Sequence, residues 1–576
     1  MNPRLRKLWP WLAAVLSGLL LGLCYPRWDV GELIWIWQIP LFAALWFGET
    51  SGPRWRRGMA LGYLSGLTFF LINLSWLFEL RHVAGTVWAG LGGWFALAAY
   101  VAVYFGLWGA FAATVGRWLP AEAEPRKKTS LPGSDLFGPS VAVIRAAALG
   151  GAAWCGLEWL RGIAFTGFGW NGLGVALHEN LYLIQIADTI GATGLAFVVV
   201  FCNAVWTATL IRIGREMAVR QRVRPHLDFA VAVALIIVVF LYGVTKILTR
   251  PAPTPENSVN LRALLVQLNT PIDEKWDEAH AQRIIEQYRD LTLGYVESSA
   301  YDLVIWPETA LPGRWTFPGV QTYLNDHILK AADFSLILGI EDEELDGNVL
   351  YNCLALTRGS TRESQLHRKL HRVPFGEYIP LRESFPVFHW IAGGIVPMDF
   401  TAGSSYEPLK LHRPEAGIIP LICFEDTVGR LARRFVRPGP QLIVNVTNDG
   451  WFYESQAAIQ HLVNAKFRCV ELRRPMARAA NTGVSAIIDE IGSLEFPDAA
   501  PGTTGHERLR VVQDPLTGNT FTTGTLPATI ALPKAPPITF YSRVGDAFSV
   551  TLGAIAALVT GLGVIRSRRH RAATTR

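Results

Sequence analysis

Three segments of the sequence place a reactive side chain where a strand is expected to end. Glu308 stands in VIWPETALP, Lys369 stands in HRKLHRVPFGEYIP, and Cys423 ends the apolar run of GIIPLICFEDTV. Acyl transfer through a thioester needs a carboxylate to remove the thiol proton, a thiolate to attack a carbonyl, and a cation to stabilise the oxyanion. The three residue types therefore indicate covalent catalysis by Cys423.

Two carboxylates, Glu425 and Asp426, follow the cysteine almost directly. Negative charge near a thiol opposes its ionisation. Lys369 and the start of a helix expected in TVGRLARRFV would offset this effect, and the backbone amide of Phe424 is a candidate second donor to an oxyanion. The two acids either orient Lys369 or an incoming amine, or, in the case of Asp426, cap the following helix.

Each of the three residues also has a structural explanation when it is taken alone. A lone cysteine at the end of an apolar strand commonly packs in a core, a strand-end glutamate can be held by a turn, and a lysine among basic neighbours can be solvated. The argument for catalysis therefore rests on the order, the spacing and the flanking sequence of the three segments together.

The reactive segments lie in a region with the pattern of an α/β domain. Apolar or alternating runs bounded by polar turns predict strands at 261–268, 301–308, 334–341, 348–357, 417–425, 441–449 and 483–490. Helical patterns fall between them at 276–298 and 457–474. Buried strands that alternate with helices predict α/β layers. Residues 119–140 and 497–526 are expected to be inserted loops.

Long apolar runs flank this domain on both sides. Of the 576 residues, 50% are hydrophobic and 17% are charged. A stretch of about 18 or more apolar residues can span a bilayer as a helix. The candidate spans are 8–25, 33–48, 58–78, 86–116, 141–160, 182–211, 227–247 and 546–566. We therefore expect a membrane domain of seven helices at 1–247, a catalytic domain at 248–545, and a last helix with a basic tail at 546–576.

The basic residues alternate between the connections. Lys and Arg gather at the N-terminus, in the second, fourth and sixth connections, and in the tail. Because positive residues mark the cytoplasmic side, both termini are expected in the cytoplasm and the domain at 248–545 outside it, in the periplasm of a bacterium. The net charge of +6 reflects these connections and gives no reason to infer nucleic-acid binding. The cysteines form no CxxC pair and no His cluster has zinc spacing, so neither a disulfide framework nor a metal site is predicted.

The segments WPE, K…VPFGEY and ICFED, in this order, resemble the Glu-Lys-Cys motifs of the nitrilase or carbon–nitrogen hydrolase superfamily. The likeness extends to NVTNDGWF at 445–452 and to residues 460–489. The arrangement of seven spans, such a domain and an eighth span is similar to that of the apolipoprotein N-acyltransferase family. The segments at 158–174 and 270–277 are also similar to that family in sequence. The resemblance covers nearly the whole chain. It implies a polytopic membrane domain of about eight helices and a nitrilase-like αββα sandwich.

The resemblance also implies roles for single residues. Cys423 would be the nucleophile, Glu308 the general base, and Lys369 the oxyanion stabiliser. Other residues that match positions used around the triad are Trp276, Glu377, Phe424 and Glu425. Phe424 departs from the family pattern, which often has tyrosine there, so any role of that hydroxyl is lost in this chain.

The implied reaction moves an acyl chain from a phospholipid, typically phosphatidylethanolamine, to Cys423, and then to the α-amine of S-diacylglyceryl cysteine at the start of an apolipoprotein. No cofactor is implied, the implied place is the bacterial inner membrane, and we expect a monomer. The apolar stretch 385–400, with Phe388 and Trp390, is expected either to dip into the outer leaflet and guide acyl chains or to pack in the core.

Two other classes of function compete with this interpretation. A membrane-tethered amidase or nitrilase would use water as the second acceptor, which the triad permits. A transporter or receptor would leave the Glu-Lys-Cys set unexplained.

Overall fold

The computed structural model describes residues 3–49, 52–119, 134–218, 226–275, 278–344, 349–359, 363–382, 384, 398–495 and 508–574. The chain separates into two compact units. The first consists of Met1–Ser75, Trp94–Leu248 and Val544–Arg576, and the second consists of Trp76–Gly93 and Thr249–Arg543. Both units are therefore discontinuous in sequence.

The first unit is helical. Its longer helices are α1 (Pro3–Gly22), α2 (Ile39–Phe47), α3 (Arg54–Asn73), α5 (Val87–Ala112) from Trp94 onward, α6 (Ser134–Arg161), α8 (Ala187–Ala218), α9 (Leu227–Leu248) and α17 (Ala547–Thr574). Shorter helical segments include η1 (Gly31–Trp35), η4 (Leu173–Leu177) and α7 (Leu181–Ile184). Residues 134–140 belong to α6, so this part of the expected loop at 119–140 is helical instead. Residues 120–133 lie outside the described part of the chain.

Several of these helices are suited to a bilayer. Within the described residues, five are long and apolar enough to cross a membrane, namely α5, α6, α8, α9 and α17. A sixth is obtained if α3 and the segment Ser75–Val83, bent by 54°, count as one span. The expected number of eight exceeds this count. The reasons are that α2 has only nine residues, and that α1 begins with Arg4, Arg6 and Lys7 and is apolar only beyond them.

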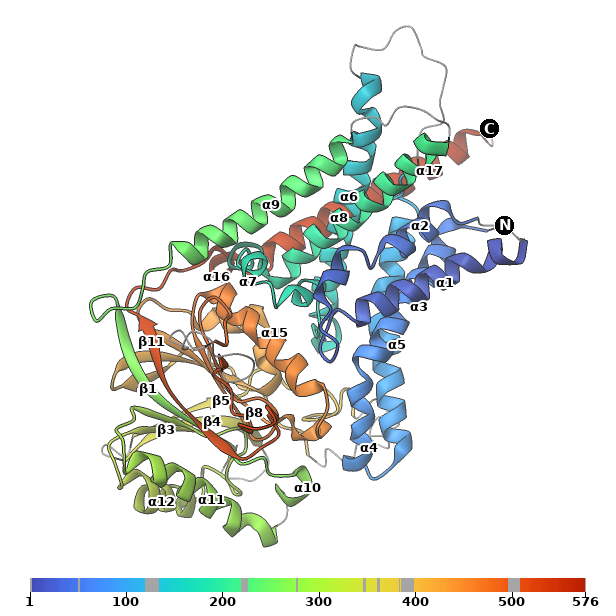
Figure 1. The fold of residues 1–576 in the computed structure, drawn as a ribbon. Helices are drawn as coiled ribbons and strands as arrows, with labels where there is room; N and C mark the ends of the chain where they lie inside the picture. Colours follow the sequence, from blue (N-terminus) through green and yellow to red (C-terminus); the bar gives the residue numbers. More distant parts are fainter. Residues whose placement is uncertain are drawn as a thin grey trace. The chain divides into compact units, whose positions relative to one another are not determined.

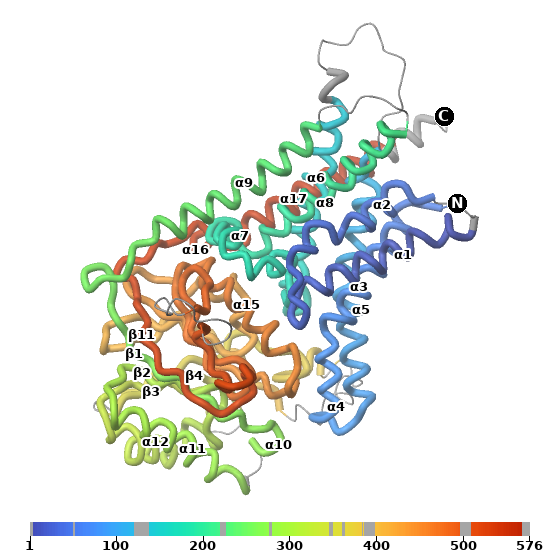
Figure 2. The backbone as a smooth tube through the Cα atoms, in the orientation of Figure 1, coloured from blue at the N-terminus to red at the C-terminus, as the bar shows by residue number. Residues whose placement is uncertain are grey.

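Close contact between glycines brings two of the spanning helices together. A Cβ on Gly156 of α6 would lie 2.4 Å from the Cα of Gly553 of α17. Small residues allow transmembrane helices to approach until their backbones touch. In Figure 2, α17 runs alongside α6 and α8, and it contacts both.

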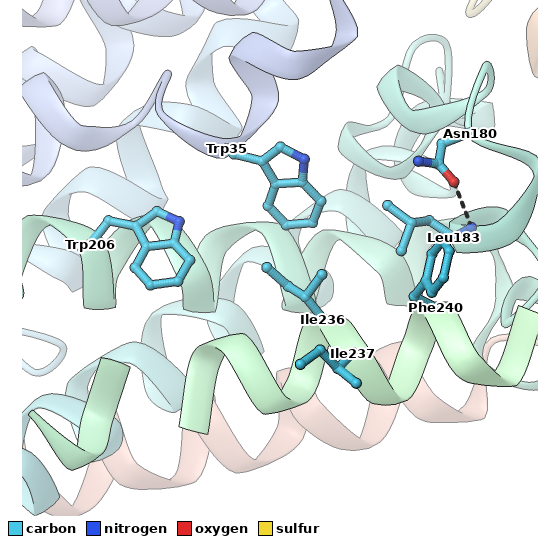
Figure 3. Close-up of a pocket in the computed structure, with 7 residues that line it drawn as sticks. All are labelled: Trp35, Asn180, Leu183, Trp206, Ile236, Ile237 and Phe240. Carbon is cyan, nitrogen blue, oxygen red and sulfur yellow. Dashed lines mark hydrogen bonds between the residues drawn. The ribbon is translucent and has the colours of Figure 1, made fainter. Parts of the chain in front are cut away.

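An apolar pocket of about 310 Å³ lies in the same unit, next to α9. Figure 3 shows its lining: Trp35, Asn180, Leu183, Trp206, Ile236, Ile237 and Phe240. The side chain of Asn180 accepts a hydrogen bond from the Leu183 amide at 3.0 Å and so caps α7. The Asn180 side chain of this lining therefore has a structural partner.

The second unit contains two β-sheets. The first has the strand order β11-β1-β2-β3-β4-β5 and the second has the order β10-β9-β8-β7-β6. The strands are β1 (Ser258–Gln267), β2 (Leu303–Ile305), β3 (Ser335–Glu343), β4 (Leu350–Arg358), β5 (Ser364–Arg368), β6 (Leu409–His412), β7 (Glu415–Ile422), β8 (Gln441–Thr447), β9 (Met476–Ala480), β10 (Ala486–Ile488) and β11 (Gly524–Pro533). In the first sheet β1, β2 and β3 are parallel, and in the second β7, β8 and β9 are parallel.

The layers of this unit follow from three apolar clusters. One cluster takes side chains from both sheets, such as Leu265 of β1 and Val444 of β8, and therefore lies between the sheets. A second joins the first sheet to α11 (Glu278–Val296) and α12 (Pro318–Leu324). A third joins the second sheet to α14 (Gly429–Ala432) and α15 (Ala457–Leu472). The arrangement is the expected αββα sandwich, and Figure 1 shows α11 and α12 along the outer face of the sheet that contains β3.

A segment from between the membrane helices also belongs to this second unit. The Trp76 indole donates a hydrogen bond to Gln460 Oε1 of α15 at 3.1 Å, and its ring packs against Phe452 with the centroids 4.3 Å apart. The rings of His82 and Tyr453 are 4.7 Å apart. Residues Trp76–Gly93 are therefore part of the sandwich unit.

The strands and helices predicted from the sequence are present, with shifts of a few residues at their ends. The expected loop at 497–526 is wrong in part, because β11 begins at Gly524 and pairs with β1 along ten residues. Val512 upstream of it belongs to the cluster between the sheets. Residues 496–507 lie outside the described part of the chain.

Candidate active site

Cys423 occupies a sharp turn at the end of a buried strand. Strand β7 ends at Ile422, and Cys423 opens the short helix η6 (Cys423–Thr427) with a φ angle of 51°. Few residues other than glycine adopt such angles, and strain of this kind gathers at functional sites. Asn445 Nδ2 of β8 donates to the Cys423 carbonyl at 3.1 Å and so holds the turn. The cysteine is half-buried.

Glu308 lies two residues beyond the Trp306 that follows β2, and the neighbouring strand supports it. Gly339 of β3 donates its amide to the Pro307 carbonyl at 3.0 Å, and the Ala310 amide donates to the Gly339 carbonyl at 2.8 Å. A Cβ on Gly339 would lie 2.4 Å from the Glu308 Cα, so only glycine fits beneath this turn. Lys275 Nζ, buried in the same region, donates to the Glu308 carbonyl at 2.8 Å.

Lys369 follows β5 and reaches two carboxylates. Its Nζ lies 2.8 Å from Glu377 Oε1 and 3.7 Å from Glu308 Oε1. The side chain is only 2% exposed. Burial opposes the positive charge, but Glu377 and Glu308 together raise the pKa of Lys369 well above its usual range. The side chain is therefore an ammonium group at neutral pH.

Asn352, which the sequence analysis did not single out, links the two carboxylates. From β4 its Nδ2 donates to Glu308 Oε1 at 2.8 Å and to Glu377 Oε1 at 2.9 Å. The second oxygen of Glu377 accepts from the Val373 amide at 2.8 Å. The signal in the sequence is weak, since Asn352 is the single amide side chain of the largely apolar strand β4, LYNCLALTR.

Glu425 joins the cysteine turn to the lysine segment through backbone amides. Its Oε1 accepts from Leu370 at 2.7 Å and from His371 at 2.8 Å, and its Oε2 accepts from Ile422 at 2.9 Å. Burial raises the pKa of Glu425 to about 7, against the opposite effects of Lys369 and of these amides. The carboxylate therefore fixes the cysteine turn and the lysine segment to each other.

Asp426 does not cap a helix, contrary to one of the two roles considered from the sequence. The helix expected in TVGRLARRFV is the four-residue α14, which begins at Gly429 and has no side-chain hydrogen bond at its N-cap. Asp426 is fully buried and its Oδ1 lies 2.8 Å from His461 Nε2 of α15. The dipole of a longer helix is therefore absent from this turn, and Asp426 pairs with a histidine instead.

The electrostatic surroundings of the thiol keep it protonated in the resting site. Burial raises the pKa of Cys423 well above its usual range, and the Glu308 carboxylate adds to this effect, while Lys369 opposes it. A thiol in this condition needs a base during the reaction, and Glu308 is the carboxylate that acts on it most strongly. The neighbouring Phe424 stacks its ring on His371, with the centroids 5.9 Å apart.

The structure thus brings together five of the residues expected at the site: Glu308, Lys369, Glu377, Cys423 and Glu425. The expected residues Trp276, Phe388 and Trp390 lie outside the described residues, so their participation stays a prediction. Within the described residues, Asn352, Lys275 and Asn445 are added to the site by their contacts.

Two family models match parts of this sequence. Residues 17–205 match the model of the apolipoprotein N-acyltransferase N-terminal domain, and residues 262–497 match that of the carbon-nitrogen hydrolase. An apolipoprotein N-acyltransferase of Geobacter metallireducens is 30% identical over 567 residues, covering 97% of this chain and 96% of that protein. Another, from Methylococcus capsulatus, is 31% identical over 518 residues, covering 88% and 91%.

Among solved structures, a CN-hydrolase superfamily protein from Xanthomonas campestris covers 47% of this chain and 91% of its own, with 17% identity and a TM-score of 0.32. The family assignment rests on the sequence relatives and not on this structure. Because the likeness to those relatives extends over nearly the full length of both chains, this chain belongs to the apolipoprotein N-acyltransferase family.

Proposed function

We propose that this chain transfers a fatty acyl chain from a membrane phospholipid, through a thioester on Cys423, to the N-terminal amine of S-diacylglyceryl cysteine in apolipoproteins. The observation that carries the proposal is the polar set around the strained cysteine turn. Lys369 lies 2.8 Å from Glu377 and 3.7 Å from Glu308. The names of the relatives supply the acceptor class, lipoproteins.

In the first half-reaction Glu308 takes the thiol proton of Cys423, and the thiolate attacks the ester carbonyl of the phospholipid. Lys369 faces the negative charge that develops on the carbonyl oxygen, and its contacts with Glu377 and Glu308 hold it in place beforehand. The tetrahedral intermediate collapses, the C–O bond to glycerol breaks, and the leaving alkoxide takes the proton from Glu308. The products are a Cys423 thioester and a lysophospholipid.

In the second half-reaction the α-amine of the acceptor attacks the thioester carbonyl. Glu308, now ionised again, accepts a proton from the nitrogen as the C–N bond forms. The C–S bond breaks, and the proton returns from Glu308 to the sulfur. The amide product leaves and the thiol of Cys423 is restored, so no cofactor is needed.

Membrane anchoring suits this chemistry because both substrates are lipids. The sandwich unit is joined to helix α9 at its beginning and to helix α17 at its end, and both helices are suited to span a bilayer. Such tethering keeps the thiol near the ester bond and the acceptor, which replaces a search in three dimensions. We further propose that phosphatidylethanolamine is the donor and that the protein acts as a monomer. We also propose that it lies in the inner membrane, with both termini cytoplasmic and the sandwich unit periplasmic.

Intact-mass measurement after incubation with phosphatidylethanolamine vesicles tests the proposal. We expect a mass gain of one acyl chain that hydroxylamine removes and that the Cys423→Ser variant does not show. Addition of a synthetic diacylated lipopeptide should discharge the thioester and yield a triacylated peptide. Absence of the acyl adduct, with the protein folded, would overturn the proposal.

The carbon-nitrogen hydrolase model that matches residues 262–497 favours one alternative, hydrolysis of an amide with water as the acceptor. The same experiment separates the two. Discharge of the thioester by water at the same rate with and without lipopeptide would identify a hydrolase. Acceleration by lipopeptide identifies a transferase.

A further inference from the structure

Four charged side chains form a buried cluster behind the cysteine turn. His461 of α15 lies between two carboxylates: its Nε2 is 2.8 Å from Asp426 Oδ1 and its Nδ1 is 2.8 Å from Asp449 Oδ1. Arg478 of β9 completes the cluster, with Nη2 at 3.2 Å from Asp449 Oδ2 and Nε at 3.7 Å from Asp426 Oδ2. We call these four residues the charge quartet.

With both carboxylates ionised, the quartet is neutral only if His461 is an imidazolium, with a proton on each ring nitrogen. Two carboxylates and one guanidinium leave one negative charge, which an imidazolium cancels. The four side chains are at most 5% exposed. A net charge buried to this degree is costly, whereas a paired set is tolerated. With both ring nitrogens facing carboxylates, His461 must donate from both, which only the imidazolium form does.

The ionisation of His461 agrees with this geometry. Burial lowers its pKa, but Asp426 and Asp449 raise it to about 9 despite Arg478. Arg478 and His461 in turn lower the pKa of Asp449 below its usual range, against the effect of burial. A further charged pair on α15 is Arg468 with Glu471, 2.7 Å apart, and Arg468 donates to the Asp426 carbonyl at 3.3 Å.

Two members of the quartet, Asp426 and Asp449, belong to chain segments that adjoin or hold Cys423. Asp426 belongs to η6, the short helix that Cys423 opens. Asp449 stands two residues beyond β8, the strand from which Asn445 holds the Cys423 carbonyl, and its charge acts to raise the pKa of the Cys423 thiol. An uncancelled negative charge at either carboxylate would therefore oppose formation of the thiolate.

We propose that Asp426, His461, Asp449 and Arg478 form a positioning device that fixes the cysteine turn and keeps its surroundings neutral. Without this neutral set, the free energy needed to remove the Cys423 proton would be higher. His461 acts through the two carboxylates and touches no substrate. This role rests on the proposed function only in so far as Cys423 is the nucleophile.

The test measures the thiolate of Cys423 directly, without any lipid. The rate of alkylation by iodoacetamide is followed by mass spectrometry of the Cys423 peptide between pH 6 and 10, with Cys423→Ser as the blank. The variants are His461→Gln, which removes the positive charge, and His461→Gln combined with Asp449→Asn, which removes one charge of each sign. The exposed His327 supplies the matched control His327→Gln.

We expect His461→Gln to be alkylated about tenfold more slowly throughout this pH range, because the uncancelled negative charge lowers the fraction of thiolate. The double variant should return to within about threefold of the unsubstituted protein, because the quartet is neutral again. His327→Gln should change nothing. A double variant that is as slow as or slower than His461→Gln would show that the residues matter only for packing and would overturn the proposal.

The two proposals fail separately. If the alkylation pattern is as expected but no acyl adduct forms, the proposal for the quartet stands and the proposed function is wrong. If the adduct forms but the alkylation rate does not change in His461→Gln, the proposed function stands and the proposal for the quartet is wrong.

Discussion

A Cβ on Gly339 would lie 2.4 Å from the Cα of Glu308, which is far inside van der Waals contact. Strand β3 therefore passes directly beneath the turn that carries the proposed general base. Because the obstructing atoms belong to the backbone, they cannot rotate away as a side chain would.

The first prediction follows from this contact. Gly339→Ala should push the Glu308 turn away from β3 and lower the rate of thioester formation by about 100-fold, because a displacement of about 1 Å in a catalytic group has an effect of that size. Overpacking should also cost about 1–3 kcal/mol of stability. The rate of acyl-adduct formation and the thermal midpoint, Tm, measure the two effects. Gly319→Ala is the control, since a Cβ there meets open space. Equal rates in both variants would contradict the argument.

The second prediction concerns the amide that donates to both Glu308 and Glu377. Asn352→Ala removes two hydrogen bonds to carboxylates, each worth about 1.5–3 kcal/mol, and should slow thioester formation by about 10- to 100-fold. Asn352→Asp should be worse at neutral pH, because three carboxylates would then face one ammonium group, and should recover partly in acid. The pH–rate profiles of the two variants measure this difference. The exposed Asn260 of β1 provides the control Asn260→Ala. Identical profiles for the two Asn352 variants would argue against an electrostatic role.

How far the sequence predicts this site depends on where each signal lies. Glu308 and Cys423 stand at strand ends, and the apolar strand that precedes each of them is visible in the local sequence. Lys369 follows β5, whose sequence SQLHR is polar and is not among the strands predicted from apolar runs. Asn352 and His461 gain their roles only when β4, α15 and the turns meet in space. No periodicity or spacing along the chain carries that information.

The fold shows the same division between local and distant information. Strands such as β7 and β8 are short and largely apolar, which is typical of strands buried in a parallel sheet. Strand β11 pairs with β1, its partner more than 250 residues away in the chain, and contains two prolines. Proline is tolerated there because β11 is an edge strand. Its local sequence therefore resembles a loop, and so does that of the residues preceding it.

The third prediction concerns pH and Glu425. Burial raises its pKa from the ordinary value near 4.5 to about 7, so the folded protein holds this proton more tightly than the unfolded chain. The contribution of this group to stability is therefore greatest below pH 4.5 and falls as the pH rises toward and beyond 7. Thermal unfolding followed between pH 4 and 8 should show a decline in Tm of a few degrees that is absent in Glu425→Gln.

Glu425→Gln should also impair the site itself. The amide has a single acceptor oxygen, whereas the carboxylate accepts from three backbone amides with its two oxygens. One of those amides would then face an NH₂ group, so we expect thioester formation to fall by about 10-fold or more. Glu415→Gln, at the exposed start of β7, is the control. A Glu425→Gln protein with unchanged rate and an unchanged pH slope would disprove the role assigned to these contacts.

The fourth prediction concerns the membrane unit. Gly156 and Gly553 are so close that a Cβ on either would lie less than 3 Å from the Cα of the other. Gly156→Leu or Gly553→Leu should therefore separate α6 from α17, expose the last helix to proteolysis in detergent micelles, and lower Tm by several degrees. Gly563→Leu, on the same helix α17 but in open space, is the matched control. If helix packing in this unit is driven by close backbone contact, only the first two variants will be cleaved, since added apolar volume by itself is harmless on a lipid-facing surface. Equal cleavage of all three would show that the glycine contact does not hold α17 in place.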